Sequence, residues 1–164
     1  MILARMTRLF HAADHYPPVG AILRPGHYGR MIGVSLHCHY DHAREKILEE
    51  VRAAGFRDKP SRLRSIFACL TEEDVRAYVE TQCARHAGRV REPLYEVESI
   101  DAAAPTHVGD WTIAEAVRCG GDEAVLLAEL YWKGSEGPER PPVGTYRELV
   151  TTSPLRVVRR LDAA

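Results

Sequence analysis

Apolar and polar residues follow two spacings along the chain, one typical of strands and the other typical of helices. Alternation with a period of two, or a short apolar run bounded by proline and glycine, predicts an extended segment. The segments that fit are residues 7–13, 21–24, 61–70, 93–98, 145–151 and 155–161. Apolar residues three and four positions apart instead predict helices over residues 43–54, from Thr71 onward, from Thr112 to Gly120 and over 122–132.

The helix ends carry recognisable signals. Thr71 with Asp74, and Thr112 with Glu115, have the spacing of a capping box, and Gly55 is a natural stop for the first predicted helix. Asp122 is expected to cap the last predicted helix, which runs to Trp132. On that first helix, the acidic residues alternate with basic ones and are interpreted as solvated surface charges. The acidic and basic residues concerned are Glu45, Lys46, Glu49 and Arg52.

The order of these elements predicts an α+β fold. Strands and helices are mixed, connections are short, and no strand–helix–strand spacing repeats. We therefore expect one domain over residues 1–164, built on a split sheet of mixed or antiparallel strands with flanking helices. Residues 27–42 fit no element clearly, and residues 100–109 are expected to form a loop. Tyr131 and Trp132 are expected in the core because aromatic side chains bury much area in small domains.

Composition narrows the class of protein only slightly. The chain has 164 residues with 45% hydrophobic and 27% charged residues, which are ordinary globular values. A formal net charge of -1 gives no general reason to expect binding to nucleic acid or an anionic membrane. There is no apolar run of membrane-spanning length and no paired cysteine motif among the four cysteines, so we expect a reduced, cytoplasmic protein.

Two groups of residues are candidates for chemistry. Glu148 follows directly on a loop of turn-forming residues, 134–144, and can project into a cleft that the loop covers; alternatively, it lies on the solvated face of a half-buried strand. His37, His39 and Asp41 would share one side of a strand, with His42 adjacent, which suits a transition metal. No second ligand cluster follows at the spacing of a zinc finger, so a metal is not expected.

Several short segments, taken in order, resemble the NAD-dependent ADP-ribosyltransferase fold. They are residues 9–13 (LFHAA), 19–23 (VGAIL), 65–68 (SIFA) continuing to Tyr78, 148–150 (ELV) and 154–158 (PLRVV). The first segment, together with Tyr146-Arg147 and Pro154 to Val157, is similar to the small bacterial rifamycin ADP-ribosyltransferases. A glutamate before Leu-Val is similar to transferases and toxins with a glutamate on a terminal strand, including DNA-modifying ones.

The resemblance implies roles for individual residues. His11 would hydrogen-bond the ribose of NAD, and Ala12 would offer backbone groups to the nicotinamide amide. Ser65 and Phe67 lie in the middle motif, where the family usually has a tyrosine that stacks on nicotinamide; Ile66 or Phe67 stands there instead. The remaining implied contacts are a second aromatic wall from Tyr78, a phosphate contact from Arg62 and catalysis by Glu148.

The chemistry implied is transfer of ADP-ribose from NAD, used as a substrate, to an unknown acceptor, with loss of nicotinamide. A carboxylate beside the ribose stabilises its oxocarbenium-like transition state. Tyr146 stands two residues before Glu148, where the family often has glutamate or glutamine, so the acceptor stays open between a protein, a nucleic acid and a small molecule. The alternatives are a non-catalytic NAD or nucleotide-binding module of the same fold and a metal-binding protein that uses residues 37–41.

Overall fold

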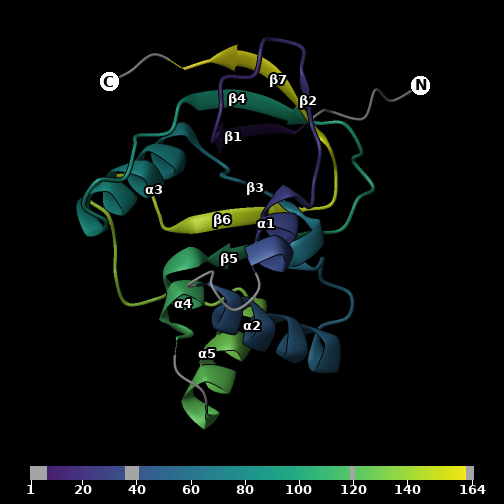
Figure 1. Ribbon diagram of the computed structural model, residues 1–164, viewed down its shortest axis with the longest axis vertical. Helices are drawn as coiled ribbons and strands as arrows, with labels where there is room; N and C mark the ends of the chain where they lie inside the picture. Colours follow the sequence, from purple (N-terminus) through teal and green to yellow (C-terminus); the bar gives the residue numbers. More distant parts are fainter. Residues whose placement is uncertain (1–6, 36–40, 119–120, 162–164) are drawn as a thin grey trace.

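The computed structural model describes residues 7–35, 41–118 and 121–161, and these form two antiparallel sheets with helices around them (Figure 1). One sheet has the strand order β1-β4-β7-β2, and the other has the order β3-β6-β5. The strands of the two sheets are β1 (Arg8–Ala12), β2 (Ile22–Leu23), β3 (Ile66–Ala68), β4 (Leu94–Ser99), β5 (Thr106–Asp110), β6 (Arg147–Thr151) and β7 (Leu155–Arg160). Every pairing within the sheets is antiparallel, so the expected α+β class is confirmed and the pairings are antiparallel rather than mixed.

The helices fall into two groups. The helices α2 (His42–Gly55), α4 (Trp111–Ala116) and α5 (Asp122–Trp132) lie together beyond the sheet that contains β6 (Figure 1). The helices α1 (His27–Ser35) and α3 (Glu72–Arg85) lie at opposite sides of the two sheets, and the short 3₁₀ helix η2 (Arg62–Arg64) precedes β3. No helix among the described residues is both long and apolar enough to cross a bilayer.

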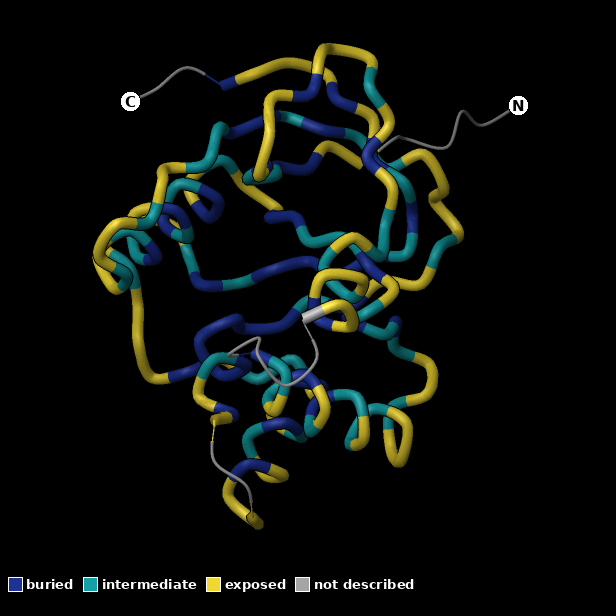
Figure 2. Tube along the Cα trace, viewed as in Figure 1, coloured by how far each residue is buried: buried dark blue, intermediate teal, exposed yellow. Residues whose placement is uncertain are grey.

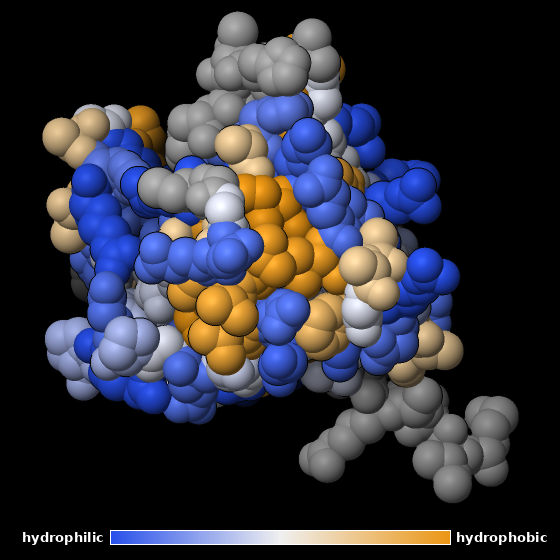
Figure 3. Space-filling model, turned by 90° about the horizontal axis from the view of Figure 1, so that it is seen from below, coloured by the Kyte–Doolittle hydropathy of each residue, from blue (hydrophilic) through white to orange (hydrophobic). Residues whose placement is uncertain are grey.

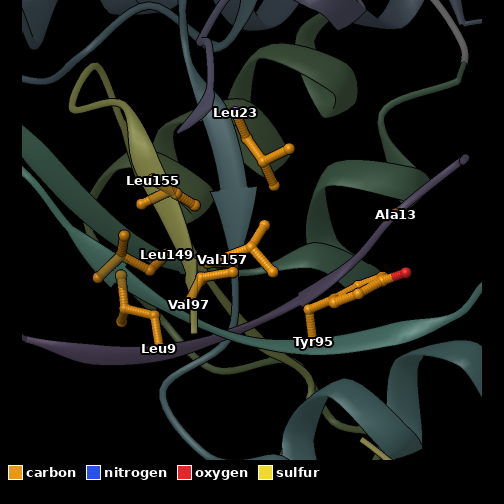
Figure 4. Packing of buried hydrophobic residues seen from close by; sticks show 9 residues of the cluster. Leu9, Ala13, Leu23, Tyr95, Val97, Leu149, Leu155 and Val157 are labelled. Carbon is orange, nitrogen blue, oxygen red and sulfur yellow. The ribbon is translucent and has the colours of Figure 1, made fainter. Parts of the chain in front are cut away.

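Hydrophobic burial joins the two sheets into one body. Leucine and valine side chains from both sheets meet in a cluster that also includes Tyr95 (Figure 4). Its buried members are Leu9, Ala13, Leu23, Ala68, Tyr95, Val97, Leu149, Leu155 and Val157. Burying one such leucine or valine side chain contributes about 1.5–3 kcal/mol. Figure 2 accordingly shows buried backbone running through the central strands.

A second cluster packs α2, α4 and α5 together. It contains Leu48, Ile113, Val117, Tyr131 and Trp132, so the expectation that Tyr131 and Trp132 are core residues is confirmed. Trp132 Nε1 donates a hydrogen bond of 2.8 Å to the carbonyl oxygen of Leu48. The surface at this end of the molecule has an apolar patch (Figure 3), and the exposed large apolar residues that α5 contributes are Val125, Leu126 and Leu130.

Four local predictions are wrong. Residues 61–70 form η2 and a strand of only three residues, because Ser65 N donates to Arg62 O and closes a 3₁₀ turn. Part of residues 100–109 forms β5, which continues to Asp110 and pairs with β6. The helix α4 starts one residue early because Asp110, not Thr112, caps it: Asp110 Oδ1 accepts from the backbone N–H of Thr112. Asp122 is the first residue of α5, and Gly121 occupies the cap position.

The helix α1 lies where the pattern indicated no clear element. Glycine in a helix interior costs about 1 kcal/mol relative to alanine, and this helix contains Gly29 and Gly33. A Cβ atom on Gly29 would lie 1.9 Å from the carbonyl oxygen of Leu63, so the glycine permits α1 to lie against η2. This close approach holds η2, and therefore Arg62, against α1.

Candidate functional site

A cavity of about 610 Å³ lies where β1 of one sheet meets β3 of the other. Phe10 and Cys69 form an isolated antiparallel bridge there, with both backbone N–H groups donating across it. Residues of α1 line one side of the cavity and residues of α3 and α4 line the other. The seven residues that the resemblance assigned to NAD binding or catalysis all line this one cavity: His11, Ala12, Arg62, Ser65, Phe67, Tyr78 and Glu148.

His11 is held in one orientation at the cavity wall. Its Nδ1 lies 2.7 Å from the carbonyl oxygen of Phe67, and because a carbonyl can only accept, Nδ1 carries the proton. Burial lowers the pKa of His11 below its usual 6.5, although the hydrogen bond to Phe67 opposes this. The ring is therefore neutral at pH 7, and its Nε2 is a hydrogen-bond acceptor.

Glu148 is buried, so the interpretation of this residue as a solvated strand residue is wrong. Its residue exposure is 9%, and its Oε1 accepts hydrogen bonds from Arg62 Nη1 and from the hydroxyl of Tyr131, the latter at 2.7 Å. The same Arg62 Nη1 donates to the Tyr131 oxygen over 2.6 Å. Glu148, Arg62 and Tyr131 therefore form a closed triangle at the back of the cavity, which fixes the carboxylate.

Glu45 is the residue for which the sequence analysis was most clearly wrong. It is 1% exposed rather than solvated, and both of its carboxylate oxygens accept from Arg62 Nε, at 3.0 and 3.3 Å. Its Oε1 also accepts from the Tyr28 hydroxyl at 3.1 Å and from Arg44 Nε at 3.3 Å. Arg44 in turn pairs with Asp41 over 2.9 Å. No pattern on α2 distinguishes Glu45 from a surface glutamate, because Tyr28 and Arg62 are each 17 positions away in the sequence.

Arg62 was expected to contact a phosphate of NAD, but its guanidinium is already paired within the protein. It is 6% exposed, and its guanidinium is shared between Glu45, Glu148 and Tyr131. Burial lowers the pKa of Arg62, but the carboxylates of Glu148 and Glu45 outweigh this and raise it well above its usual value. Its charge is thus already compensated within the protein.

Phe67, the aromatic residue of the middle motif, and Tyr131 lie against the guanidinium of Arg62. The Phe67 ring centroid lies 4.8 Å from Arg62 Cζ, and the rings of Phe67 and Tyr28 meet edge to face at 5.4 Å. The hydroxyl of Tyr78 lies 3.3 Å from Arg89 Nη2. Ser65 is 1% exposed and its hydroxyl donates to Ser61 O at 2.7 Å, so this hydroxyl is already engaged. Tyr28, which the sequence analysis missed, supplies an aromatic wall opposite α3.

Gly109 makes room for Tyr131 beside Glu148. Gly109 pairs with Glu148 across β5 and β6, and a Cβ atom there would lie 2.5 Å from Tyr131 Cε2. We expect Gly109→Ala to lower the free energy of unfolding by about 1–3 kcal/mol, because the buried ring must shift. Gly33→Ala is the matched control, since its Cβ would meet nothing within 4 Å. Urea denaturation measures both; equal stabilities of the two variants would contradict the assigned contact.

His107 is a buried neutral histidine on the strand beside Glu148. Its Nε2 donates to Tyr131 O at 2.9 Å, its ring lies against Tyr131 and Trp132, and burial lowers its pKa to about 4. The unfolded chain binds this proton near pH 6.5, so between pH 6.5 and about 4 the unfolded state holds more protons and stability falls as pH decreases.

We expect His107 to contribute a stability loss of about 3 kcal/mol between pH 7 and pH 4, at about 1.4 kcal/mol per pH unit. In His107→Gln the free energy of unfolding should therefore fall less over this range than in wild type. His86→Gln, at a partly exposed position whose side chain makes no hydrogen bond or ion pair among the described residues, should behave as wild type. Denaturation series at both pH values test this, and an unchanged pH dependence in His107→Gln would refute it. His11 contributes with the same sign in all three proteins because its pKa is also lowered.

The histidine-rich segment yields no metal centre in the part of the chain that the structure describes. His37 and His39 lie outside the described residues, and Asp41 is paired with Arg44. Among the described residues, no group of three histidine, cysteine, aspartate or glutamate side chains is arranged to hold a metal ion.

The loop of residues 134–144 does not line the cavity. Gly137 N donates to Asp110 Oδ2 at 2.8 Å, and Glu139 pairs with Arg85 at 2.5 Å. None of the described residues that line the cavity belongs to this loop, so the expectation that the loop covers the cleft of Glu148 is wrong.

A known family model matches most of the chain. The model of a family described as "Protein of unknown function (DUF2441)" matches residues 21–159. No curated protein matches the chain. Of the seven candidate residues, Arg62, Ser65, Phe67, Tyr78 and Glu148 lie inside the matched range, and His11 and Ala12 precede it.

Proposed function

The chain belongs to the DUF2441 family, and we propose that it transfers ADP-ribose from NAD to an acceptor and releases nicotinamide. The observation that carries the proposal is the meeting of His11 and Glu148 in one cavity, although they come from different sheets and are 137 positions apart in the sequence. We assign the two sheets to an ADP-ribosyltransferase-like arrangement on the same ground. A cavity of about 610 Å³ is within the range of small-molecule and cofactor sites.

The proposed reaction exchanges one bond at the ribose anomeric carbon. The bond from C1′ to the nicotinamide nitrogen breaks, and its electron pair leaves with nicotinamide. A nucleophile of the acceptor forms the new bond to C1′ and loses its proton to solvent. The ribose carries positive charge in the transition state, which a fixed, buried carboxylate at Glu148 stabilises. His11 Nε2 accepts a hydrogen bond from a ribose hydroxyl.

Two further features of the cavity fit NAD. Arg24 and Arg30 line it, both are exposed, and neither has an ion-pair partner among the described residues, so they are available for the pyrophosphate that Arg62 was expected to bind. Phe67 and Tyr28 on one side and Tyr78 on the other offer aromatic surfaces to the nicotinamide ring. In this proposal, Phe67 takes the place of the tyrosine that ADP-ribosyltransferases usually have.

The acceptor stays open between a protein, a nucleic acid and a small molecule. Because the loop of residues 134–144 is tied to Asp110 and Arg85, we do not assign it to acceptor binding. We place the reaction in the cytoplasm, where NAD is available and thiols such as those of Cys69 and Cys83 stay reduced.

A second candidate is an NAD or nucleotide-binding module without catalysis. It is favoured by the ion pair of Arg62 with Glu148, which engages one oxygen of the carboxylate before any substrate binds. It is also favoured by the absence of a tyrosine from the middle motif, where Ile66 and Phe67 stand.

The deciding experiment combines two measurements on purified wild type and Glu148→Gln. Nicotinamide release from NAD is followed with and without cell lysate as a source of acceptor, and NAD binding is measured by calorimetry. Release that depends on Glu148 supports the transferase. Binding without release supports the binding module, and a folded protein that neither binds nor cleaves NAD rules out both.

A further inference from the structure

The buried charges behind Glu148 form a chain that crosses three elements. Glu45 comes from α2, Arg62 from η2 and Glu148 from β6, and their residue exposures are 1%, 6% and 9%. Arg62 bridges the two carboxylates: its Nε and Nη2 face Glu45, and its Nη1 faces Glu148. A single guanidinium therefore serves two anions, of which only Glu148 lines the cavity.

We propose that Glu45 is a positioning residue that determines, through Arg62, how much negative charge Glu148 presents to the cavity. The inference rests on the proposed function in so far as it concerns catalysis. A carboxylate fully paired with one arginine is a poor stabiliser of a developing cation, because the arginine already compensates its charge. Glu45 compensates part of the guanidinium charge, so Arg62 neutralises the ionised carboxylate of Glu148 less completely.

The hydrogen bonds support a role for Glu45 in holding Arg62 while Glu148 faces the cavity. Glu45 holds Arg62 through three N–O contacts of 3.0–3.3 Å, whereas Glu148 receives Arg62 through Nη1 alone. Only Oε1 of Glu148 is engaged by Arg62 and Tyr131. The more extensive contact thus belongs to the carboxylate that does not line the cavity.

Both positive and negative groups surround the buried charges of Glu45, Arg62 and Glu148. Arg44 donates to Glu45 and competes with Arg62 for it, and Asp41 pairs with Arg44. Tyr131, Tyr78 and Cys69 interact electrostatically with Glu148. The other titratable groups that face the chain are Tyr28, which donates to Glu45, and His107, which is near Arg62. Removing Glu45 or Arg44 should therefore shift the ionisation of Glu148 in opposite directions.

The test is a direct titration of Glu148, which does not depend on any activity. With glutamate labelled by ¹³C at Cδ, the Glu148 resonance is assigned by its loss in Glu148→Gln and followed as a function of pH. In Glu45→Gln we expect the pKa of Glu148 to fall by about one pH unit, since a neighbouring negative charge is lost. In Arg44→Gln we expect it to rise. Glu50→Gln, on the exposed side of the same helix, should leave it unchanged.

Nicotinamide release is measured on the same proteins. We expect Glu45→Gln to release nicotinamide about three to ten times more slowly at pH 7, with its acid limb moved to lower pH. An unchanged Glu148 pKa in Glu45→Gln, with the protein folded, overturns the inference whether or not NAD is cleaved. Should Glu45→Gln fail to fold, an unchanged pKa in Arg44→Gln overturns it instead. Shifted pKa values without any release of nicotinamide would uphold the coupling and reject the proposed function.

Discussion

Glu148→Gln should reduce nicotinamide release from NAD by about 10²–10³-fold, equivalent to a loss of about 3–4 kcal/mol of transition-state stabilisation. The substitution preserves the shape of the side chain and keeps an oxygen that can accept from Arg62 and Tyr131. It removes the negative charge that the cationic ribose of the proposed reaction requires. The stability of the fold should therefore change much less than the rate.

The control for this variant is Glu98→Gln on β4. Glu98 pairs with Arg156 at the surface, where loss of an ion pair costs at most about 1 kcal/mol. Initial rates and urea denaturation are compared for both variants and wild type. Release in Glu148→Gln within a factor of three of wild type would exclude Glu148 as the catalytic carboxylate.

Arg62→Met should have the largest effect on stability, a loss of about 3–5 kcal/mol at neutral pH. Methionine fills much of the space between Phe67 and Tyr131, but Glu45 and Glu148 lose the cation that they share. Arg44 remains beside Glu45, whereas Glu148 keeps, among the described residues, only the hydrogen bond from the Tyr131 hydroxyl. A buried carboxylate without its partner is the dominant cost.

The pH dependence of the unfolding free energy of Arg62→Met shows whether lost charge pairing or lost packing causes its instability. Without Arg62, the ionised carboxylates of Glu45 and Glu148 are buried without the cation that they share, and protonation relieves the cost of burying that charge. The stability deficit should therefore be largest at high pH and decrease as the pH falls. Arg156→Met, which removes a surface ion pair, serves as control. A deficit that does not vary between pH 5 and pH 8 would mean that lost packing, not lost charge, is responsible.

The sequence predicts the regular part of this fold well. Alternation located β1, β4, β6 and β7 to within one or two residues at each end, and the spacing of apolar residues located α2 and α5. The Thr71 cap is confirmed, since its hydroxyl accepts from the backbone N–H of Asp74 at 3.1 Å. These features are local, so a short window of sequence contains their cause.

The wrong predictions share a different cause, which is contact between distant segments. The strand β5 is extended because β6 pairs with it along its whole length, not because residues 106–110 have strong strand preferences. The helix α1 tolerates two glycines because one of them permits contact with Leu63. Glu45 is buried because Arg62, 17 positions away, compensates its charge.

The candidate site was likewise predictable from the sequence only where short local segments carry the signal. The short segments around His11, Phe67 and Glu148 indicated which residues would gather, and all of them line one cavity. What no segment indicated is that Arg62 would pair with Glu148 instead of remaining free, or that Tyr28 and Tyr131 would complete the surroundings. The tyrosine hydroxyls reach charges on other elements, and such partners become visible only in three dimensions.

The bridge between β1 and β3 limits how the cavity can change size. Both backbone bonds between Phe10 and Cys69, at 2.9 and 2.7 Å, and the His11 contact with Phe67 tie the two sheets together at the cavity wall. Rotating one sheet against the other would break all three at once. A bulky ligand in the cavity must therefore be accommodated by movement of α1, α3 or α4, which border the cavity outside the sheets, while the distance between the strands that carry His11 and Phe67 stays constant.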